Sequence, residues 1–397
     1  MSFRYASGIN KPGFNPLAAG TDQYKGIWSL AGQANAKGAG TWPVPPGPAL
    51  FNWGDNSSGE LGLGNITNYS SPKQIGALIT WSKIAGGTRS SRAIKADGTL
   101  WVWGSGSDGQ LGLGNTTSYS SPKQVGTLTA WSLISSRDSF TLSIKTDGTL
   151  WSWGSGSSGQ LGLGNVTSYS SPKQIGALTA WSSIACGDQC GSAIKTDGTL
   201  WSWGNNNVGR LGLNDITNRS SPVQVGALTA WSKIARGNNF ALSIKTDGTL
   251  WSWGGNGSGQ LGLGNTTDYS SPKQIGALTA WSTVAGGDRF SMATKTDGTL
   301  WVWGNNVYGQ LGLGNTTYYS SPKQVGSLTT WSNIACGSHH AILVKTDGTL
   351  WVWGRNNFGQ LDLGNTTNYS SPKQVGTLTT WLTIAGGIYH TITTKTT

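Results

Sequence analysis

Residues 151–200 read WSWGSGSSGQLGLGNVTSYSSPKQIGALTAWSSIACGDQCGSAIKTDGTL, and they decide the fold because nearly the same sequence recurs along most of the chain. From Phe51 onward this unit repeats seven times, every fifty residues and without an insertion. Self-similarity at a fixed period of roughly 20 to 50 residues is typical of architectures in which each unit buries its apolar face against its neighbours. The clearest markers are one tryptophan in every unit: Trp53, Trp103, Trp153, Trp203, Trp253, Trp303 and Trp353.

Each unit predicts four short strands. The segments 192–195 and 200–203 flank an Asp-Gly dipeptide, which is a strong hairpin signal between alternating segments because glycine accepts a positive φ. Two further strands are predicted at 171–175 (SPKQI) and 180–185 (AWSSIA). Four strands per unit, seven times over, predict an all-β chain folded as a seven-bladed β-propeller.

The ends of the repeat region indicate how the propeller closes. The last unit stops after 391–395 and lacks the second strand of its hairpin, while the first unit begins with a strand, 49–53, that lacks a hairpin partner. We therefore predict that 49–53 pairs with 391–395 and completes the seventh blade. Such a closure removes the sheet edge that an open array would expose. The chain then divides into a propeller, 49–397, and a non-repeat arm with a proline-rich linker, 1–48.

The composition fits this architecture and excludes several others. The 397 residues include 61 glycines and 22 tryptophans, with 10% aromatic and only 11% charged residues. A disordered chain would contain few aromatics, and a collagen would place glycine at every third position. The sequence has no apolar run of roughly 18 residues that could form a membrane-spanning helix. We therefore expect a folded protein without membrane insertion.

The formal net charge of +11 would favour an acidic partner, such as nucleic acid, an anionic glycan or an acidic protein surface. Many of the lysines, however, recur by symmetry rather than in one cluster, and nucleic acid binding needs a clustered basic footprint. We therefore do not expect a nucleic acid partner. The two lysine columns are Lys95, Lys145, Lys195, Lys245, Lys295, Lys345 and Lys395, and Lys73, Lys123, Lys173, Lys273, Lys323 and Lys373.

No arrangement in the sequence is typical of catalysis. It contains no Ser/His/Asp set, no phosphate-binding loop followed by a helix, and no paired carboxylates at unique positions. The three cysteines, Cys186, Cys190 and Cys336, provide neither an even disulfide framework nor a metal site with histidine at ligand spacing. We therefore expect a protein that is not an enzyme and that uses no cofactor and no metal.

Comparison of the seven units with one another separates constant from variable positions. Most columns are nearly constant, but two stretches vary strongly: one follows each Trp-Gly pair, as at 305–308, and one precedes each hairpin, as at 338–340. Both stretches lie at the ends of the hairpin strands away from the Asp-Gly turn. We therefore expect them to converge on one face of the propeller.

This face is the candidate binding site, because loops on a rigid scaffold commonly bind partners and because Arg and aromatic side chains often anchor interfaces. The alternative is neutral drift on a surface without function, and aromatic residues in the Phe140 column could instead pack between blades. The predicted partner is a host-surface glycan or a protein. The candidate residues are Arg89, Arg92, Arg137, Phe140, Arg289, Phe290, Tyr308, His339, His340, Arg355, Phe358, Tyr389 and His390.

The pattern WSWGSGSSGQLGLG, followed by SSPKQI and then by IACGDQCGSAIKTDGTLWSWG, resembles the repeat of the regulator of chromosome condensation family over 49–397. The resemblance implies a seven-bladed propeller, whereas the fold alone does not determine what it binds. Guanine-nucleotide exchange is the best-known activity of the family, but the uniform period leaves no room for an inserted wedge. The family's usual histidine after Gly-x-x is present only at His340 and His390, and the other units carry Ser90, Phe140, Cys190, Phe240 and Phe290.

Residues 1–48 lie outside the repeat. Their beginning lacks the apolar segment of a secretory signal peptide, 22–37 predicts a short helix, and 43–48 (PVPPGP) is typical of a stiff linker. The segments YKGIWSL (24–30) and AGTWP (39–43) resemble an N-terminal segment of structural proteins of tailed bacteriophages. This resemblance implies attachment to a virion, whereas the alternative is an arm that packs on the propeller rim. The residues assigned to attachment are Tyr24, Ile27, Trp28, Leu30 and Trp42.

The leading hypothesis is therefore a non-enzymatic phage virion protein, a tail fibre or tail-associated protein assembled in the host cytoplasm. Residues 1–48 would bind other virion proteins, and the propeller face would bind the host surface. One alternative is a virion decoration protein without a receptor role. Another is an intracellular protein-interaction or nucleotide-exchange propeller, and a secreted inhibitor propeller is disfavoured because no signal peptide is expected.

Overall fold

The computed structural model describes residues 47–396 except 78–79, 178 and 228. The arm helix predicted at 22–37 and the five attachment residues lie outside this part of the chain. Every regular element of the described part is a β-strand, and these strands belong to one compact unit, Pro48–Thr397. The all-β class predicted from the sequence is confirmed.

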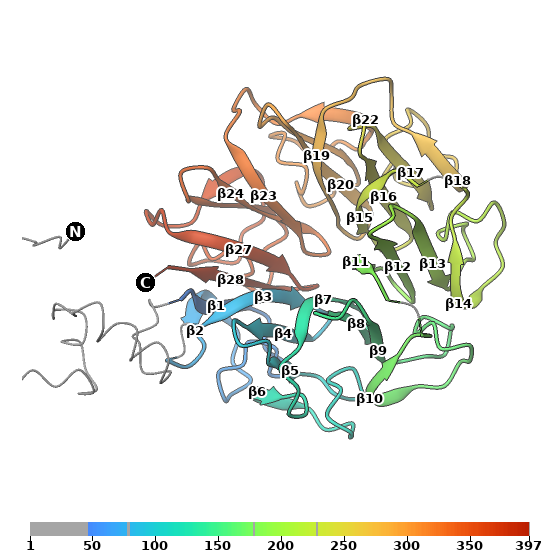
Figure 1. Cartoon of the computed structure of the whole chain (residues 1–397). Coiled ribbons are helices and arrows are strands. Elements are labelled where there is room, and N and C mark those ends of the chain that lie inside the picture. Colours follow the sequence, from blue (N-terminus) through green and yellow to red (C-terminus); the bar gives the residue numbers. More distant parts are fainter. Residues whose placement is uncertain (1–46, 78–79, 178, 228, 397) are drawn as a thin grey trace, which may run out of the picture. The chain divides into compact units, whose positions relative to one another are not determined.

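Seven four-stranded antiparallel sheets form the blades of a propeller (Figure 1). The first three blades are blade 1, with β3 (Trp81–Gly86), β4 (Ser90–Lys95), β5 (Leu100–Gly104) and β6 (Tyr119–Gln124); blade 2, with β7 (Trp131–Arg137), β8 (Phe140–Lys145), β9 (Leu150–Gly154) and β10 (Tyr169–Gln174); and blade 3, with β11 (Trp181–Cys186), β12 (Cys190–Lys195), β13 (Leu200–Gly204) and β14 (Arg219–Gln224).

The next three blades repeat this order, from an innermost strand through a central hairpin to an outermost strand. They are blade 4, with β15 (Trp231–Arg236), β16 (Phe240–Lys245), β17 (Leu250–Gly254) and β18 (Tyr269–Gln274); blade 5, with β19 (Trp281–Gly286), β20 (Phe290–Lys295), β21 (Leu300–Gly304) and β22 (Tyr319–Gln324); and blade 6, with β23 (Trp331–Cys336), β24 (His340–Lys345), β25 (Leu350–Gly354) and β26 (Tyr369–Gln374).

Blade 7 combines the two ends of the repeat region, in the order β27 (Trp381–Gly386), β28 (His390–Lys395), β1 (Ala49–Gly54) and β2 (Tyr69–Gln74). The strand β1 pairs antiparallel with β28, from Ala49 opposite Lys395 to Gly54 opposite His390. In Figure 1 the blue and dark red ends of the propeller lie side by side at this blade. The hairpin strand that the last repeat lacks thus comes from the start of the first repeat.

The Asp-Gly turns form one face of the propeller, which we call the constant face. In blade 1, Gly98 has a φ of +78°, and a Cβ there would clash with the carbonyl oxygen of Thr129. Asp97 Oδ1 accepts hydrogen bonds from the N–H and the hydroxyl of Thr99, and the Thr99 hydroxyl accepts one from Trp101 Nε1 at 3.0 Å. The same turn recurs at Asp147, Asp197, Asp247, Asp297 and Asp347.

The lysine next to each of these turns lies over tryptophan rings. Lys145 Nζ is 3.6 Å from the centre of the Trp151 ring and 5.0 Å from that of Trp131. Where β1 carries Phe51 in place of tryptophan, Lys395 lies over that ring at 4.6 Å. A cation over an aromatic face contributes about 0.5–1 kcal/mol at a solvent-accessible site. The lysine column therefore packs against the fold instead of forming a basic patch.

One tryptophan of each blade fills the joint with the preceding blade. Trp203 is fully buried, and its Nε1 donates to the backbone oxygen of Gln160 in blade 2 at 2.9 Å. It packs in one cluster with Phe140 and Leu142 of blade 2 and with Trp181 of its own blade. Burial of a side chain of this size contributes on the order of 2–3 kcal/mol. The same bond joins Trp53 to Gln360, Trp103 to Glu60, Trp153 to Gln110, Trp303 to Gln260 and Trp353 to Gln310.

The joint between blades 3 and 4 differs from the others. Arg210 stands where most units have glutamine, and its backbone oxygen accepts a hydrogen bond from Arg236 Nη1 at 2.7 Å. Arg236 is buried, and burial lowers the pKa of its guanidinium. Among the described residues, Trp253 Nε1 has no hydrogen-bond partner. The arginine therefore takes the acceptor that a tryptophan uses in six other joints.

The innermost strands of all seven blades line a channel with a volume of about 230 Å³. Arg137, at the end of β7, reaches into it and donates to the backbone oxygen of Gly286 in β19 at 3.3 Å. Within the described residues there is no helix with the length and apolar character that a membrane crossing requires.

Candidate binding face

Each blade joins its two variable stretches by a backbone hydrogen bond, at the hairpin end opposite the Asp-Gly turn. In blade 6, Arg355 N donates to His339 O at 2.9 Å, and in blade 5, Asn305 N donates to Arg289 O at 2.8 Å. The convergence predicted from the strand directions is confirmed, and we call this side the variable face. The equivalent bonds are Asp55 to Tyr389, Ser105 to Arg89, Ser155 to Ser139, Asn205 to Gln189 and Gly255 to Asn239.

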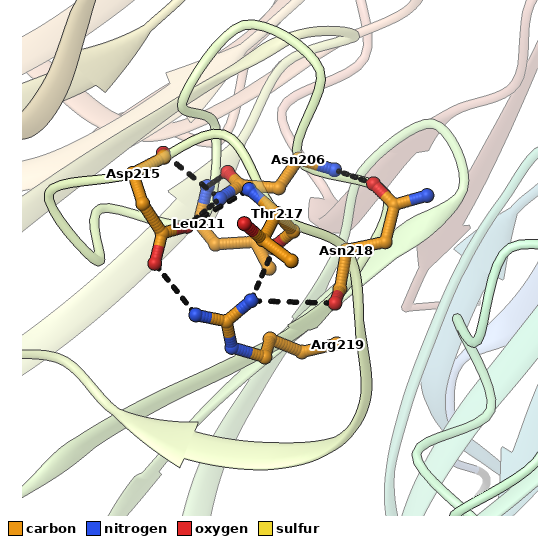
Figure 2. Close-up of polar contacts among 6 residues, drawn as sticks. All are labelled: Asn206, Leu211, Asp215, Thr217, Asn218 and Arg219. Carbon is orange, nitrogen blue, oxygen red and sulfur yellow. Dashed lines mark hydrogen bonds and ion pairs between the residues drawn. The ribbon is translucent and has the colours of Figure 1, made fainter.

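In five of the seven blades, a buried asparagine holds the loop that follows Trp-Gly. Figure 2 shows this loop in blade 3, where Asn206 Nδ2 donates to the backbone and the side chain of Asp215 and Asn206 Oδ1 accepts from Leu211 N. Asn206 is fully buried, whereas its neighbour Asn207 is exposed. The loop can therefore vary beside the asparagine without losing its shape. Asn56, Asn256, Asn306 and Asn356 make corresponding contacts.

The outer edge of blade 3 departs from the other blades in three coordinated positions. Arg219 stands where they have tyrosine, and its Nη2 lies 2.6 Å from Asp215 Oδ2 (Figure 2). Val223 stands where they have the lysine that lies over this tyrosine, as Lys73 lies over Tyr69 at 5.1 Å. The valine avoids a repulsion between two cations, and the aspartate, which replaces asparagine, pairs with the arginine.

The turns nearest the axis surround the mouth of the channel. A cavity of about 250 Å³ opens there, and Asp138, Asp188, Asp288 and His339 are among the residues that line it. Burial and the negative charge of Asp188 raise the pKa of Asp138 to about 6. Within the described residues, neither Asp138 nor Asp188 belongs to an ion pair. Arg137 lines the same cavity, so three aspartates stand against one arginine and the mouth is acidic.

Asp288 lies at the same mouth in a different environment. One of its carboxylate oxygens is 3.4 Å from His339 Nε2, and the other accepts a hydrogen bond from the side chain of Asn238. Burial alone would raise the pKa of Asp288, but these hydrogen bonds and the charges of His339 and Arg137 hold it below its ordinary value. Asp288 therefore remains ionised and is already partnered.

Five of the predicted binding residues form one connected group, which we call the Arg355 cluster. The guanidinium carbon of Arg355 lies 5.0 Å from the ring centre of Tyr308, 5.0 Å from that of Tyr389 and 5.9 Å from that of Phe358. The rings of Tyr308 and His339 meet edge to face at 5.2 Å, and those of Phe358 and Tyr389 lie 4.9 Å apart. These residues come from blades 5, 6 and 7 and are all partly exposed.

The other arginines of the variable face are separate from this cluster. Arg89 in blade 1 and Arg289 in blade 5 are exposed. Arg137 is partly buried in the channel, and burial lowers the pKa of its guanidinium. Of these three arginines, Arg89 and Arg289 are therefore the ones exposed to solvent.

Five predicted binding residues lie inside the propeller, so their assignment to the binding face is wrong. Phe140, Phe290, His340 and His390 each begin the inner strand of a hairpin, where the side chain is enclosed by the joint between two blades. Arg92 lies two residues further along the equivalent strand β4. All five have an exposed fraction of 0% and cannot contact a partner.

The two buried histidines connect neighbouring blades. His390 Nε2 is 2.9 Å from the hydroxyl of Ser91 in blade 1, and His340 Nε2 is 3.1 Å from the hydroxyl of Thr391 in blade 7. Burial lowers the pKa of His340 to about 3 and that of His390 to about 4. Both side chains are therefore neutral at pH 7 and serve the fold.

Arg92 is buried among neutral acceptors. Its guanidinium donates to the hydroxyls of Thr141, Ser90 and Ser136 and to the backbone oxygen of Gln110, at 2.7 to 3.0 Å. Burial lowers the pKa of Arg92 to about 10, which still leaves it charged at pH 7. It ties blades 1 and 2 together.

The acidic mouth was not among the residues predicted from the sequence. Asp138, Asp188, Asn238 and Asp288 stand immediately before or within the variable turns, and the polar character of this column was the available signal. Their gathering around one axis depends on the ring of blades. Across the described part of the chain, no group of three or more His, Cys, Asp or Glu side chains could hold a metal ion.

Solved structures with a similar fold include human WBSCR16, with 22% identity, a TM-score of 0.80 and coverage of 88% of this chain and 99% of that chain. Prp20p from Saccharomyces cerevisiae shows 20% identity, a TM-score of 0.78 and coverage of 89% and 93%. Yeast RCC1 (Prp20) in complex with Kap60 shows 18% identity, a TM-score of 0.79 and coverage of 100% and 97%. No curated protein sequence matches the chain.

The family model described as the regulator of chromosome condensation (RCC1) repeat matches this chain seven times, and the matches together cover most of the propeller. The matched residues are 49–94, 97–144, 147–194, 197–244, 247–294, 297–344 and 347–393. The chain therefore belongs to the regulator of chromosome condensation (RCC1) repeat family.

Proposed function

We propose that this chain is a non-enzymatic protein-binding propeller whose variable face contacts its partner. The proposal rests on one observation, namely where in the structure the seven repeats differ from one another. Seven nearly identical units differ mainly in two stretches, and a backbone hydrogen bond joins these stretches on one face in every blade. Loops on a rigid scaffold commonly carry binding residues, and the two stretches that vary most are loops held on such a ring.

Solved relatives support a protein partner. One structure was described together with the binding of Prp20p to Gsp1p and histones, and another contains Kap60 bound to yeast RCC1 (Prp20). The variable face of this chain offers tyrosine and arginine in the Arg355 cluster, and these residue types are enriched at protein interfaces.

We further propose that residues 1–48 attach the propeller to the virion of a tailed phage, assembled in the host cytoplasm, so that the variable face meets a protein or glycan of the host surface. The support is the resemblance of YKGIWSL and AGTWP to phage structural proteins, together with the proline-rich linker that follows. Other virion proteins would be the partners of the arm.

Mass spectrometry of purified phage particles from the source culture tests the virion proposal. We expect a constant number of copies per particle, and a low symmetric number would favour a tail fibre over a decoration protein of the capsid. Deletion of 1–48 should abolish incorporation while the propeller still folds. Complete absence of the chain from particles would contradict the virion proposal and leave the protein-binding propeller.

The similarity to Prp20p, described together with its binding to Gsp1p, favours a second candidate, an intracellular interaction or nucleotide-exchange propeller. It is tested by nucleotide release from a purified small GTPase in the presence of the full chain. If the virion proposal is right, release should remain at the spontaneous rate. An acceleration would establish the second candidate.

A further inference from the structure

We infer that the Arg355 cluster is the docking point for an acidic side chain of a partner protein, a glutamate or aspartate in an extended segment that binds the edge of the Arg355 guanidinium. This inference rests on the proposed function, because it takes the variable face to be the surface that contacts a protein. It adds the chemistry of the partner and the position of the main contact.

Arg355 is a fixed cation without an acidic partner. Within the described residues it forms no ion pair, and its Nε is buried without a hydrogen-bond partner. Other arginines of the propeller are satisfied: Arg219 pairs with Asp215, and Arg92 and Arg236 bind several neutral acceptors. Nε is therefore closed to a ligand, but Nη1 and Nη2, which form no hydrogen bond within the described residues, are not among the buried atoms, so a ligand can reach them.

The surrounding rings orient this cation. Tyr308 and Tyr389 each lie 5.0 Å from the guanidinium carbon and come from blades 5 and 7, on either side of blade 6. A guanidinium held against aromatic faces keeps the N–H groups of its edge available, and these match the two oxygens of a carboxylate. Since the side chain is already ordered, binding costs less conformational entropy.

The geometry favours a protein carboxylate over a sugar. The ring of Tyr389 already contacts both Arg355 and Phe358, and the ring of Tyr308 contacts Arg355 and His339, so little aromatic face remains for stacking on a sugar. Arg355 also lies outside the lining of the neighbouring cavity at the channel mouth. What the cluster presents is therefore a flat, cationic edge.

Charge on the rest of the face restricts where an acidic segment can lie. Asp138 and Asp188 at the channel mouth would repel it, whereas Arg355 and the exposed Arg289 of the neighbouring blade attract it. The partner is thus expected to place its acidic residue over blades 5 to 7 and neutral or basic residues over the mouth.

The test uses the full chain as bait for a library of random dodecapeptides. Affinities of the recovered peptides are then measured for the natural chain and for three variants. Arg355→Asn installs the residue found at the equivalent Asn205 and Asn305, so the loop should fold. Arg355→Lys keeps the charge but loses the planar fork. Arg219→Tyr is the control, because it removes a partly exposed cation three blades away and installs the residue that the other blades carry.

We expect the recovered peptides to require a glutamate or aspartate. Arg355→Asn should weaken their binding by about tenfold or more, Arg355→Lys by less, and Arg219→Tyr should leave it unchanged. Hydrogen exchange of the complex should show protection at the turns that contain His339 and Tyr389.

Three results would overturn the inference, and they bear differently on the proposed function. Peptides that protect the variable face but bind Arg355→Asn equally well would refute the docking point and leave the proposed function standing. Recovery of no peptide, or of peptides that protect only the constant face, would count against both. Binding of carboxylated or sulfated oligosaccharides that depends on Arg355, without any acidic peptide, would replace the protein segment by a glycan.

Discussion

The constant and variable faces are built at opposite ends of the same hairpin strands, yet they are held together in different ways. On the constant face, side chains make the structure: Asp97 binds Thr99, which binds Trp101, and the arrangement recurs with the same residues in five other blades. On the variable face, the two stretches of each blade are joined by backbone atoms, as between Arg355 N and His339 O. Apart from the buried asparagine that holds the loop after Trp-Gly in five blades, side chains on that face are therefore free to change, because the two stretches are joined through the backbone.

The largest difference in stability is expected between a variant that truncates a joint tryptophan and one that truncates a residue of the variable face. Trp203→Ala should lower the free energy of unfolding by about 3–5 kcal/mol, because it leaves a cavity and removes the bond to Gln160 O. Tyr389→Ala, which truncates a partly exposed side chain, should lower it by about 1 kcal/mol or less. Guanidinium unfolding of both variants is the measurement. Equal losses of unfolding free energy would contradict the claim that the joint tryptophans hold the fold while the side chains of the variable face do not.

The two buried histidines, His340 and His390, should make the stability of the fold depend on pH, whereas residues of the variable face should not. Their pKa values in the folded protein are about 3 and 4, below the ordinary value of 6.5. As the pH falls below 6.5, the unfolded chain takes up protons first, so stability is lost by up to about 1.4 kcal/mol per pH unit for each histidine. The loss ends only when the pH reaches the folded pKa.

A double variant, His340→Phe with His390→Phe, removes this effect. Phenylalanine already occupies the position in three blades, and Ser91 and Thr391 keep hydrogen bonds to backbone oxygens. Between pH 7 and pH 5 the natural chain should lose about 2–4 kcal/mol more than the variant. Because buried carboxyls such as Glu60, whose pKa burial raises to about 7, are present in both proteins, the comparison cancels them. Parallel pH profiles would show that the histidines are not buried in neutral form.

A smaller loss of stability is expected at the Asp-Gly turns of the constant face, where two variants of Asp97 distinguish the role of its hydrogen bonds from the role of its charge. Asp97→Ala should cost about 1 kcal/mol or less, because the turn loses the acceptor for Thr99. Asp97→Asn keeps an acceptor oxygen and should cost still less, since Lys95 lies over the Trp101 ring at 3.9 Å. Thermal unfolding of the two variants measures the difference. An equal loss in both would mean that the carboxylate charge, and not the turn, is important there.

Much of this fold could be predicted from the sequence because every column is sampled seven times. The Asp-Gly turns, the four strands per unit and the pairing of 49–53 with 391–395 follow from local patterns and from counting half-hairpins. The burial of Arg92 could also have been found: at the equivalent positions most units carry Leu, Met or Ile, so the column faces the core. Its single arginine was misleading because arginine is usually exposed.

The candidate site was less predictable because its residues belong to different blades. Tyr308, Arg355 and Tyr389 come from blades 5, 6 and 7, and no spacing along the chain indicates that their side chains meet. The acidic mouth likewise exists only once the turns of blades 2 and 3 are brought to one axis. Sequence variation predicted that the variable stretches share one face, while the distances within that face required the ring.

A propeller with a neutralised variable face is the most direct test of the division between fold and function. In this variant the turn pairs 88–89, 138–139, 188–189, 288–289, 338–339 and 388–389 become Asn-Asn, as at 238–239, and Arg355 becomes Asn. Binding of peptides selected on the natural chain is measured alongside the unfolding midpoint. We expect the midpoint to change little and the binding to fall by about tenfold or more. Unchanged binding by the neutralised propeller would contradict the central claim, because it would place the binding surface among the constant columns.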